Sequence, residues 1–323
     1  MDAFKYIFSW VLWPGLFAIC MAVTAYGFVN DHPVLFFNFA YVFLIISLFF
    51  LEQWMPHERE WLKPDGQNIA SILHTLSSKG TVQSLLIFGG AIGLADMIGT
   101  VRDEGYGLWP RDWPMAAQVA LGVVAAEFAL YWAHRIAHEI EFFWRFHAIH
   151  HSVTKLWFLN TGRFHFVDSL VSIVLGMAVL LALGAPIEVI KWLSAVTAFI
   201  GMLTHCNVEM RFGPLNWIFN TPGLHRWHHS KDLSEGNRNY GENIMLWDQL
   251  FGTYYNADYR PPVDIGIKEH MPARFMHQIA WPFLSHVSRK KIAPEYEPIP
   301  FEREPDSVFN FIFNRKDAKT RRD

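Results

Sequence analysis

Residues 114–151 read PMAAQVALGVVAAEFALYWAHRIAHEIEFFWRFHAIHH, an apolar run followed by two clusters of histidines. Glu127 is the only charged residue in 114–133, and about 20 apolar residues are enough for a helix to cross a bilayer. This stretch therefore predicts a membrane-spanning helix that delivers His134 and the histidines after it to one face of the membrane.

Further apolar runs lie on both sides of this stretch, and the chain as a whole is 52% hydrophobic and 18% charged. The runs cover residues 7–29, 33–51, 81–95 and 169–204. The last run is long enough for two helices, with Gly184 and Pro186 at the turn between them. We therefore expect an all-α integral membrane protein with about six transmembrane helices, including this helical hairpin, and a histidine-rich cap.

The pattern divides the chain into three parts. Residues 1–66 form an N-terminal transmembrane hairpin and its connection, 67–256 carry the histidine motifs, and 257–323 form a C-terminal region. Within that last region, 272–288 place apolar residues near one helical face, which Pro282 breaks, and a basic cluster at 289–291 follows. Such a segment is predicted to lie on an anionic membrane surface, where it would act as a lid over the histidines.

The distribution of charge predicts the orientation. Most of the 27 Lys and Arg residues lie in 134–165 or after 205, whereas the loop at 102–114 holds only Arg102 and Arg111. The positive-inside rule then places the histidine motifs and both termini in the cytoplasm.

The sequence offers no redox centre other than the histidines. Cys20 and Cys206 give neither a disulfide framework nor a CxxC site, and no glycine-rich dinucleotide motif follows a predicted strand. Any electrons must therefore come from an external donor. Nothing in the sequence predicts a nucleic-acid partner.

The spacing of the histidines predicts metal binding. Three short strings, at 134–138, 147–151 and 225–229, hold eight of the sixteen histidines, and their i, i+3 and i+4 spacing puts each set on one helical face. Imidazole suits iron, zinc, copper and nickel, and a lone zinc takes four ligands, so two ions explain the set better than one. The alternative is a group of solvated histidines at the membrane face.

These motifs resemble the fatty acid hydroxylase superfamily, also called the sterol desaturase family, whose members are integral membrane di-iron enzymes. The resemblance covers roughly 115–255 and includes HRIAHEIEFFWRFHAIHHS, NTPGLHRWHHS and the later NRNYGENIMLWDQLFGTY. Within the superfamily the chain is most similar to the alkylglycerol monooxygenase branch and its bacterial relatives. The resemblance implies two bound Fe ions and a place in a bacterial inner membrane.

The resemblance also implies a set of residues. The expected iron ligands are His134, His138, His147, His150, His151, His205, His225, His228 and His229. His165 is expected to be either a further ligand or a partner of one. Glu139 matches a glutamate of the monooxygenase branch. From their spacing alone, Glu127 is expected to bond a ligand imidazole, Asp168 to orient the ring of His165 and Glu209 that of His205. The alternative is that these are solvated surface acids.

The implied function is an O2-dependent monooxygenase that hydroxylates a C–H bond of a membrane lipid with electrons from outside. The branch that the chain resembles is associated with a reduced pterin as donor, although no pterin site is visible in the sequence. Two alternatives stay open: a lipid or sterol desaturase with the same centre, and a non-catalytic membrane metal-binding protein. The lipid, the carbon that is oxidised and the oligomeric state are not indicated.

Overall fold

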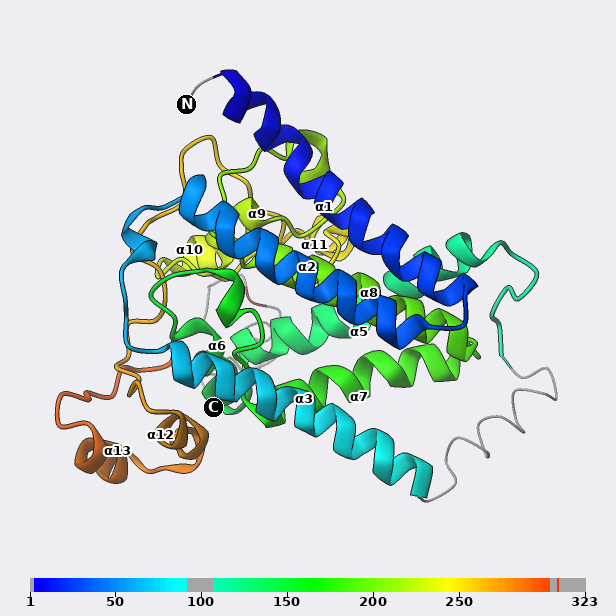
Figure 1. Cartoon of the computed structure of the whole chain (residues 1–323). Helices are drawn as coiled ribbons and strands as arrows, with labels where there is room; N and C mark the ends of the chain where they lie inside the picture. The colour runs from blue at the N-terminus through cyan, green and yellow to red at the C-terminus, as the bar shows by residue number, and fades with distance from the viewer. Residues whose placement is uncertain (1–2, 92–106, 303–306, 308–323) are drawn as a thin grey trace, which may run out of the picture.

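A computed structural model describes residues 3–91, 107–302 and 307 of the chain (Figure 1). Among these residues there is no β-strand, and the only strand-like pairings are isolated bridges such as Pro56 to Val208. The all-α prediction is confirmed. Six long helices run alongside one another: α1 Ala3–Val29, α2 Pro33–Trp54, α3 Asn68–Ala91, α5 Met115–Glu139, α7 Phe166–Ala182 and α8 Ile187–Thr204.

Four helices in the described part of the chain are long and apolar enough to cross a membrane, namely α1, α2, α5 and α8. Helix α7 has 17 residues and is therefore about 25 Å long, which is short of a typical hydrocarbon core. The third expected span, from 81 onward, continues past Ala91 into positions outside the described residues. Four of the about six predicted spans therefore correspond to described helices that are long and apolar enough to cross a membrane.

Helices α1 and α2 form the expected hairpin and pack on α8. Their shared core contains Trp13 from α1, Leu44 from α2 and Phe199 from α8, all of them buried. A second core joins α5 to the α7–α8 hairpin, where a Cβ on Gly122 of α5 would lie 2.7 Å from Leu193 of α8. The hairpin turns at Gly184, whose φ of 77° suits glycine.

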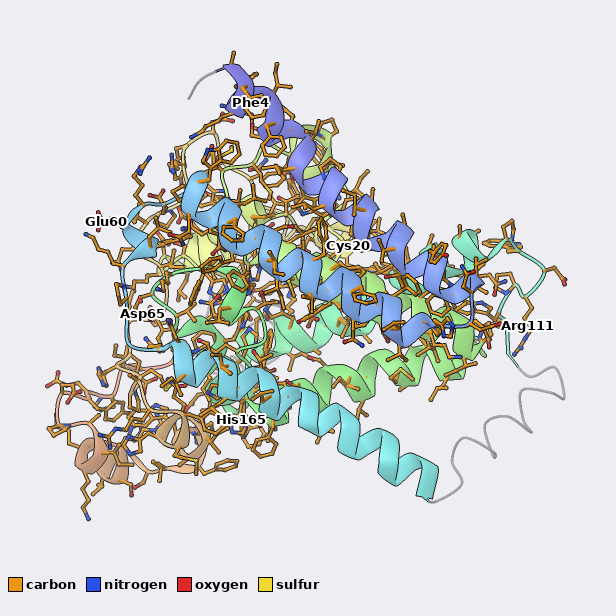
Figure 2. The ribbon with its side chains drawn as sticks, viewed as in Figure 1. Phe4, Cys20, Glu60, Asp65, Arg111 and His165 are labelled. Carbon is orange, nitrogen blue, oxygen red and sulfur yellow. The ribbon has the colours of Figure 1, made fainter. Side chains whose placement is uncertain are left out.

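Polar segments mark the two ends of this bundle. Glu60 and Asp65, in the connection after α2, lie at one end, whereas Arg111 lies at the opposite end (Figure 2). This arrangement agrees with two opposite membrane faces, with the histidine motifs near the end that carries Glu60.

Short helices gather at that end and form what we call the cap. They are α6 Glu141–His151, α9 Pro222–His228, α10 Leu233–Gly236 and α11 Leu246–Phe251, with 3-10 turns η1 Glu60–Leu62, η2 Phe158–Asn160 and η3 Gly213–Trp217. Helix α11 ends at Gly252, which has a left-handed φ of 72° and turns the chain back toward Asp248.

The C-terminal region is a set of short pieces rather than one amphipathic helix. They are α12 Phe275–Ala280, the 3-10 turn η4 Trp281–Phe283 and α13 His286–Ile292. Gln278 of α12 contacts His74 of α3 at 2.8 Å, which ties this region to the bundle. Met276, Phe283 and Val287 are exposed. Their contact with a membrane surface stays a prediction.

Candidate metal centre

Nine buried histidines gather in the cap in two groups. Within each group, one ligand atom from every residue lies within 4.8 Å of all the others. We call them the first histidine group, which is His134, His138, His147, His151 and His228, and the second histidine group, which is His150, His205, His225 and His229.

The local folding of the chain explains how the groups form. Helix α5 places His134 and His138 one turn apart, and the extended conformation of Ile140 then ends α5 and lets α6 start in a new direction. On α6, His147 and His151 turn to the first group, while His150 turns to the second. Helix α9 is divided in the same way, because His228 joins the first group and its neighbours at 225 and 229 join the second.

The inner ring nitrogens face one another at short distances. In the first group the Nε2 atom of His151 lies 3.1 Å from the Nε2 atoms of both His138 and His147. In the second group, Nε2 of His225 lies 2.9 Å from that of His205 and 3.0 Å from that of His229. Nitrogens so close together need a shared cation or proton between them, because two lone pairs at this distance repel each other.

The outer ring nitrogens determine the tautomers of two rings. Nδ1 of His134 donates to the carbonyl of Tyr240 at 2.7 Å, and Nδ1 of His228 donates to the carbonyl of Arg238 at 2.7 Å. A carbonyl can only accept, so in the neutral rings the Nε2 atoms carry the lone pairs. These two Nε2 atoms are buried and have no hydrogen-bond partner among the residues that the structure describes.

Other outer contacts follow the same pattern. Nδ1 of His147 lies 2.9 Å from Oδ2 of Asp168, and Nδ1 of His138 lies 3.0 Å from Oδ1 of Asn237. In the second group, Nδ1 of His205 lies 3.1 Å from Oδ1 of Asn160. Metal-bound histidines usually donate their second N–H to such acceptors, so these contacts fit a metal ion in the first group. In the second group the pattern holds for His205, whereas Nδ1 of His150 and of His229 is buried without a partner among the described residues.

Burial also keeps the imidazoles neutral. It holds the pKa values of His151, His228 and His229 well below the usual range, and the neighbouring imidazoles push in the same direction. Burial alone lowers the pKa of His205 to about 3. A neutral imidazole is the form that binds a metal.

The predicted carboxylates lie close to the groups, but they differ in what they contact. Asp168 contacts the ring of His147 in the first group, not that of His165 as its spacing suggested. Glu127 instead accepts from the backbone and side chain of Asn243, at 2.9 and 2.8 Å, and from the backbone of Glu242. It thereby holds the loop that offers its Tyr240 carbonyl to the first group. Asp248 supports the same loop by accepting the backbone N–H of Tyr240 at 2.7 Å.

Two further carboxylates contact no metal-group histidine among the described contacts. Glu139 pairs with Arg135 at 2.6 Å and accepts from the hydroxyl of Ser307 at 2.7 Å. Glu209 pairs with His57 at 2.7 Å, not with His205 as the sequence suggested.

The structure places His165 outside both groups. It caps the N-terminus of α7, where its Nδ1 accepts from the backbone N–H of Val167 at 3.1 Å. Its Nε2 donates to the carbonyl of Ile279 at 3.2 Å. Both nitrogens are therefore engaged away from the groups, and of the ten predicted histidines the nine others come together.

Sequence reasoning missed a carboxylate of the N-terminal hairpin. Glu52, near the end of α2, is buried, and its Oε1 accepts the backbone N–H groups of Phe158 and Asn207 at 2.9 Å each. Phe158 lies two residues before Asn160, whose side chain contacts His205, and Asn207 lies two residues after His205. A charged residue in a membrane-spanning helix indicates a functional role, and Glu52 is the charged residue of α2.

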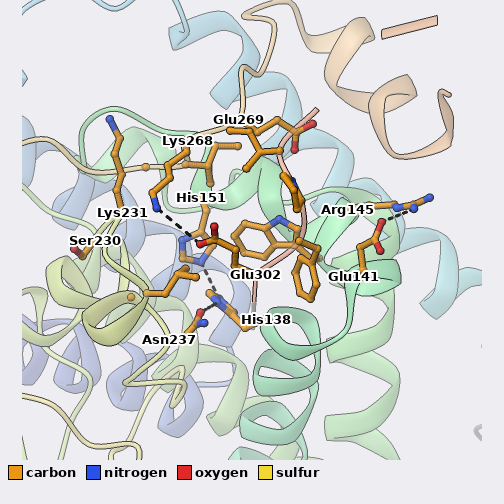
Figure 3. A pocket seen from close by; sticks show the side chains of 18 of the residues that line it. His138, Glu141, Arg145, His151, Ser230, Lys231, Asn237, Lys268, Glu269 and Glu302 are labelled. Carbon is orange, nitrogen blue, oxygen red and sulfur yellow. Dashed lines mark hydrogen bonds and ion pairs between the residues drawn. The ribbon is translucent and has the colours of Figure 1, made fainter. Parts of the chain in front are cut away.

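A cavity of about 300 Å³ opens beside the first histidine group (Figure 3). His138, His151 and His228 line it, whereas none of the four histidines of the second group does. The remainder of its wall comes from α6, from α10, and from C-terminal residues between 266 and 302.

Comparison with known proteins agrees with this geometry. Residues 119–253 match the fatty acid hydroxylase family. The chain is 49% identical over 288 residues to the ornithine lipid hydroxylase OlsE of Rhizobium tropici, covering 88% of this chain and 86% of that protein.

More distant relatives are the alkylglycerol monooxygenases of Xenopus tropicalis and Homo sapiens. Each is 30% identical to this chain, over 134 and 151 residues, and the matches span 30% and 34% of those longer proteins. No solved structure matches the chain. The resemblance seen in the sequence is confirmed: the chain belongs to the fatty acid hydroxylase family, a di-iron family, and is a membrane lipid hydroxylase.

Proposed function

We propose that this protein hydroxylates an ornithine lipid, or a closely related amino-acid lipid, at two iron ions held by the nine histidines. The observation that carries the proposal is the convergence of these buried rings in two groups. Five of the rings also turn Nδ1 to an acceptor outside the groups, namely those of His134, His138, His147, His205 and His228. The substrate class is supported by the similarity to the Rhizobium tropici hydroxylase over most of both chains.

In this proposal the first histidine group would hold one ion with five nitrogens, and the second would hold the other with four. Bound iron would supply the means to activate O2 against an unactivated C–H bond. The protein's own part is positional. Asp168, Asn237 and the Tyr240 carbonyl keep three rings of the first group in one tautomer, and burial keeps bulk water away.

The overall reaction needs an external donor. One oxygen atom of O2 enters the C–H bond, and the other leaves as water, which requires two electrons and two protons. We propose that a separate reductant supplies the electrons. A reduced pterin is the first donor to test, because the chain resembles the alkylglycerol monooxygenase branch.

We also propose a bacterial inner-membrane location with the cap and both termini in the cytoplasm. The excess of Lys and Arg in and after the histidine segments supports this orientation. The bacterial origin of the relative that is 49% identical supports the compartment.

The proposal is tested by expressing the chain in a bacterium that makes ornithine lipids but cannot hydroxylate them. Mass spectrometry of the lipid extract should show an ornithine lipid with one extra oxygen, and growth under 18O2 should label that oxygen. His225→Ala should abolish the product, whereas His277→Ala, at a histidine outside both groups, should not. Loss of two hydrogens instead would indicate a desaturase, and unchanged lipids would contradict the proposal.

A further inference from the structure

The cavity beside the first histidine group carries charges of both signs on its wall. Arg145, Lys231, Lys268 and Arg289 contribute positive charge, and Glu141, Glu269 and Glu302 contribute negative charge. Apolar contact comes from Trp144, Leu284 and Phe301. A wall of this kind suits a polar group with both charges that is attached to an apolar chain.

Most of these cationic side chains already form ion pairs with nearby carboxylates. Arg289 pairs with Glu269 at 3.0 Å, and Arg145 pairs with Glu141 at 2.7 Å. Lys231 pairs with Asp264 at 2.5 Å.

The pair of Lys268 and Glu302 is different. Its charged atoms lie 3.9 Å apart, which is too far for a hydrogen bond, and the two side chains are 57% and 58% exposed. Figure 3 shows the pair next to His151, on the side of the cavity that carries the histidines. An exposed, stretched ion pair contributes little to stability, so both partners can exchange it for a ligand at small cost.

The segment that carries Glu302 is anchored over the cavity. The hydroxyl of Ser307 donates to Glu139 at the end of α5, and the ring of Phe301 lies 6.5 Å from that of Trp144 on α6. The ring contact places Phe301 beside α6, and the adjacent Glu302 lines the cavity. Lys268 comes from a separate segment, so the two charges approach a ligand from different directions.

We propose that Lys268 and Glu302 bind the polar headgroup of the lipid substrate, with Lys268 on its anionic group and Glu302 on its ammonium group. This inference rests on the proposed function, because the headgroup of an ornithine lipid carries one carboxylate and one amine. A cavity of about 300 Å³ is at the lower end for ligand sites, and it suits a headgroup rather than two acyl chains. A phosphate with an amine shares this chemistry, so the test must separate the two sources.

The test measures lipid binding by the full-length, metal-free protein in detergent, using native mass spectrometry. Three lipids are titrated: ornithine lipid, phosphatidylethanolamine and anionic phosphatidylglycerol. Lys268→Ala and Glu302→Ala should each weaken binding of ornithine lipid roughly tenfold, the size expected for one charge-assisted contact. Glu302→Ala should leave phosphatidylglycerol binding unchanged or tighten it, because that headgroup offers no ammonium.

A matched control lies in the same region. Lys290 and Glu297 form another exposed pair, at 4.0 Å, and neither residue lines the cavity. Lys290→Ala and Glu297→Ala should bind all three lipids as the wild type does. With the reconstituted enzyme, the cavity variants should raise KM for ornithine lipid and leave the iron content unchanged.

The outcomes separate the two proposals. Equal ornithine lipid binding by the cavity variants and the controls would overturn this inference, and so would an equal loss of phosphatidylglycerol binding in Glu302→Ala. A loss restricted to phosphatidylethanolamine would assign the cavity to a phosphate headgroup and overturn the ornithine assignment. A wild-type chain that binds ornithine lipid but never oxidises it would count against the proposed function alone.

Discussion

The two histidine groups both take residues from α6 and from the α9 segment, yet they face different surroundings. Three rings of the first group line a cavity of about 300 Å³, whereas the rings of the second group do not reach it. The second group is instead supported from the membrane bundle, through Asn160 and Glu52. We infer that the first group is the one that substrate approaches, and that the second depends more on how the bundle is packed.

The largest expected effect comes from removing one inward ring from each group. His228→Ala in the first group and His225→Ala in the second should each abolish hydroxylation. Each should also lower bound iron from about two ions per chain to about one, because each group would hold its own ion. Elemental analysis and lipid mass spectrometry check both numbers, with His277→Ala as control. A fully active variant with both ions retained would contradict the division into two groups.

The next effect concerns Glu52, which we expect to act on the second group alone. Glu52→Ala leaves two buried N–H groups without their acceptor, and it frees the segments on either side of His205. Iron affinity of the second group should fall by about 100-fold, the upper range for an indirect partner, while the first group keeps its ion. The iron content of chelator-washed protein measures this.

Two further variants separate positioning from general destabilisation. Glu52→Gln keeps an oxygen acceptor and should restore most of the iron, whereas Gln53→Ala, at the exposed neighbour, should behave as the wild type. Equal loss of both ions in Glu52→Ala would show that this residue supports the whole fold and not one group.

Asp168 should produce a similar but smaller effect on the first group. Asp168→Ala removes the acceptor for Nδ1 of His147, and a water molecule can partly replace it because the carboxylate is 12% exposed. We expect about a tenfold loss of iron affinity in the first group. Competition with a metal chelator checks this value. A loss confined to the second group would reverse the assignment.

The smallest effect is expected for Glu127. Glu127→Gln replaces one carboxylate oxygen, which accepts N–H groups of the 242–243 loop, with an amide NH2 group. The loop contacts His134 through the Tyr240 carbonyl, so the effect on that ring is indirect. Iron affinity of the first group should fall less than about tenfold, with the fold preserved. The measurement is iron retention on gel filtration. A larger loss than in Asp168→Ala would mean that the loop matters more than the direct contact.

Much of the site was predictable because its signals are local. The i and i+4 spacing of His134 and His138 requires only an α-helix to place both rings on one face. The same argument groups the histidines of α6 and α9, but it cannot say that each string divides between two groups. That division depends on how the two helices cross, and the crossing is set by tertiary packing.

Other features could not be predicted because they depend on long-range contacts. Glu52 and Asn207 are 155 residues apart in the chain, and no local pattern links them. His165 follows the same histidine-rich segment as the ligands, yet the start of α7 and the carbonyl of Ile279 engage both of its nitrogens. In 272–291, by contrast, the sequence predicted a helical face broken by Pro282, and the structure has short pieces with Pro282 in the turn between them.

The division of α6 and α9 between the two groups also constrains how the protein is made. The first group is complete only when His228 of α9 has been synthesised, and the second only when His229, directly after α9, has followed. By then α1, α2, α5, α7 and α8 already precede them in the chain. Full ligand sets for both ions are therefore present only after these helices have been made. We expect metal loading to come last, so a cell that is short of iron would accumulate a full-length chain that awaits both ions.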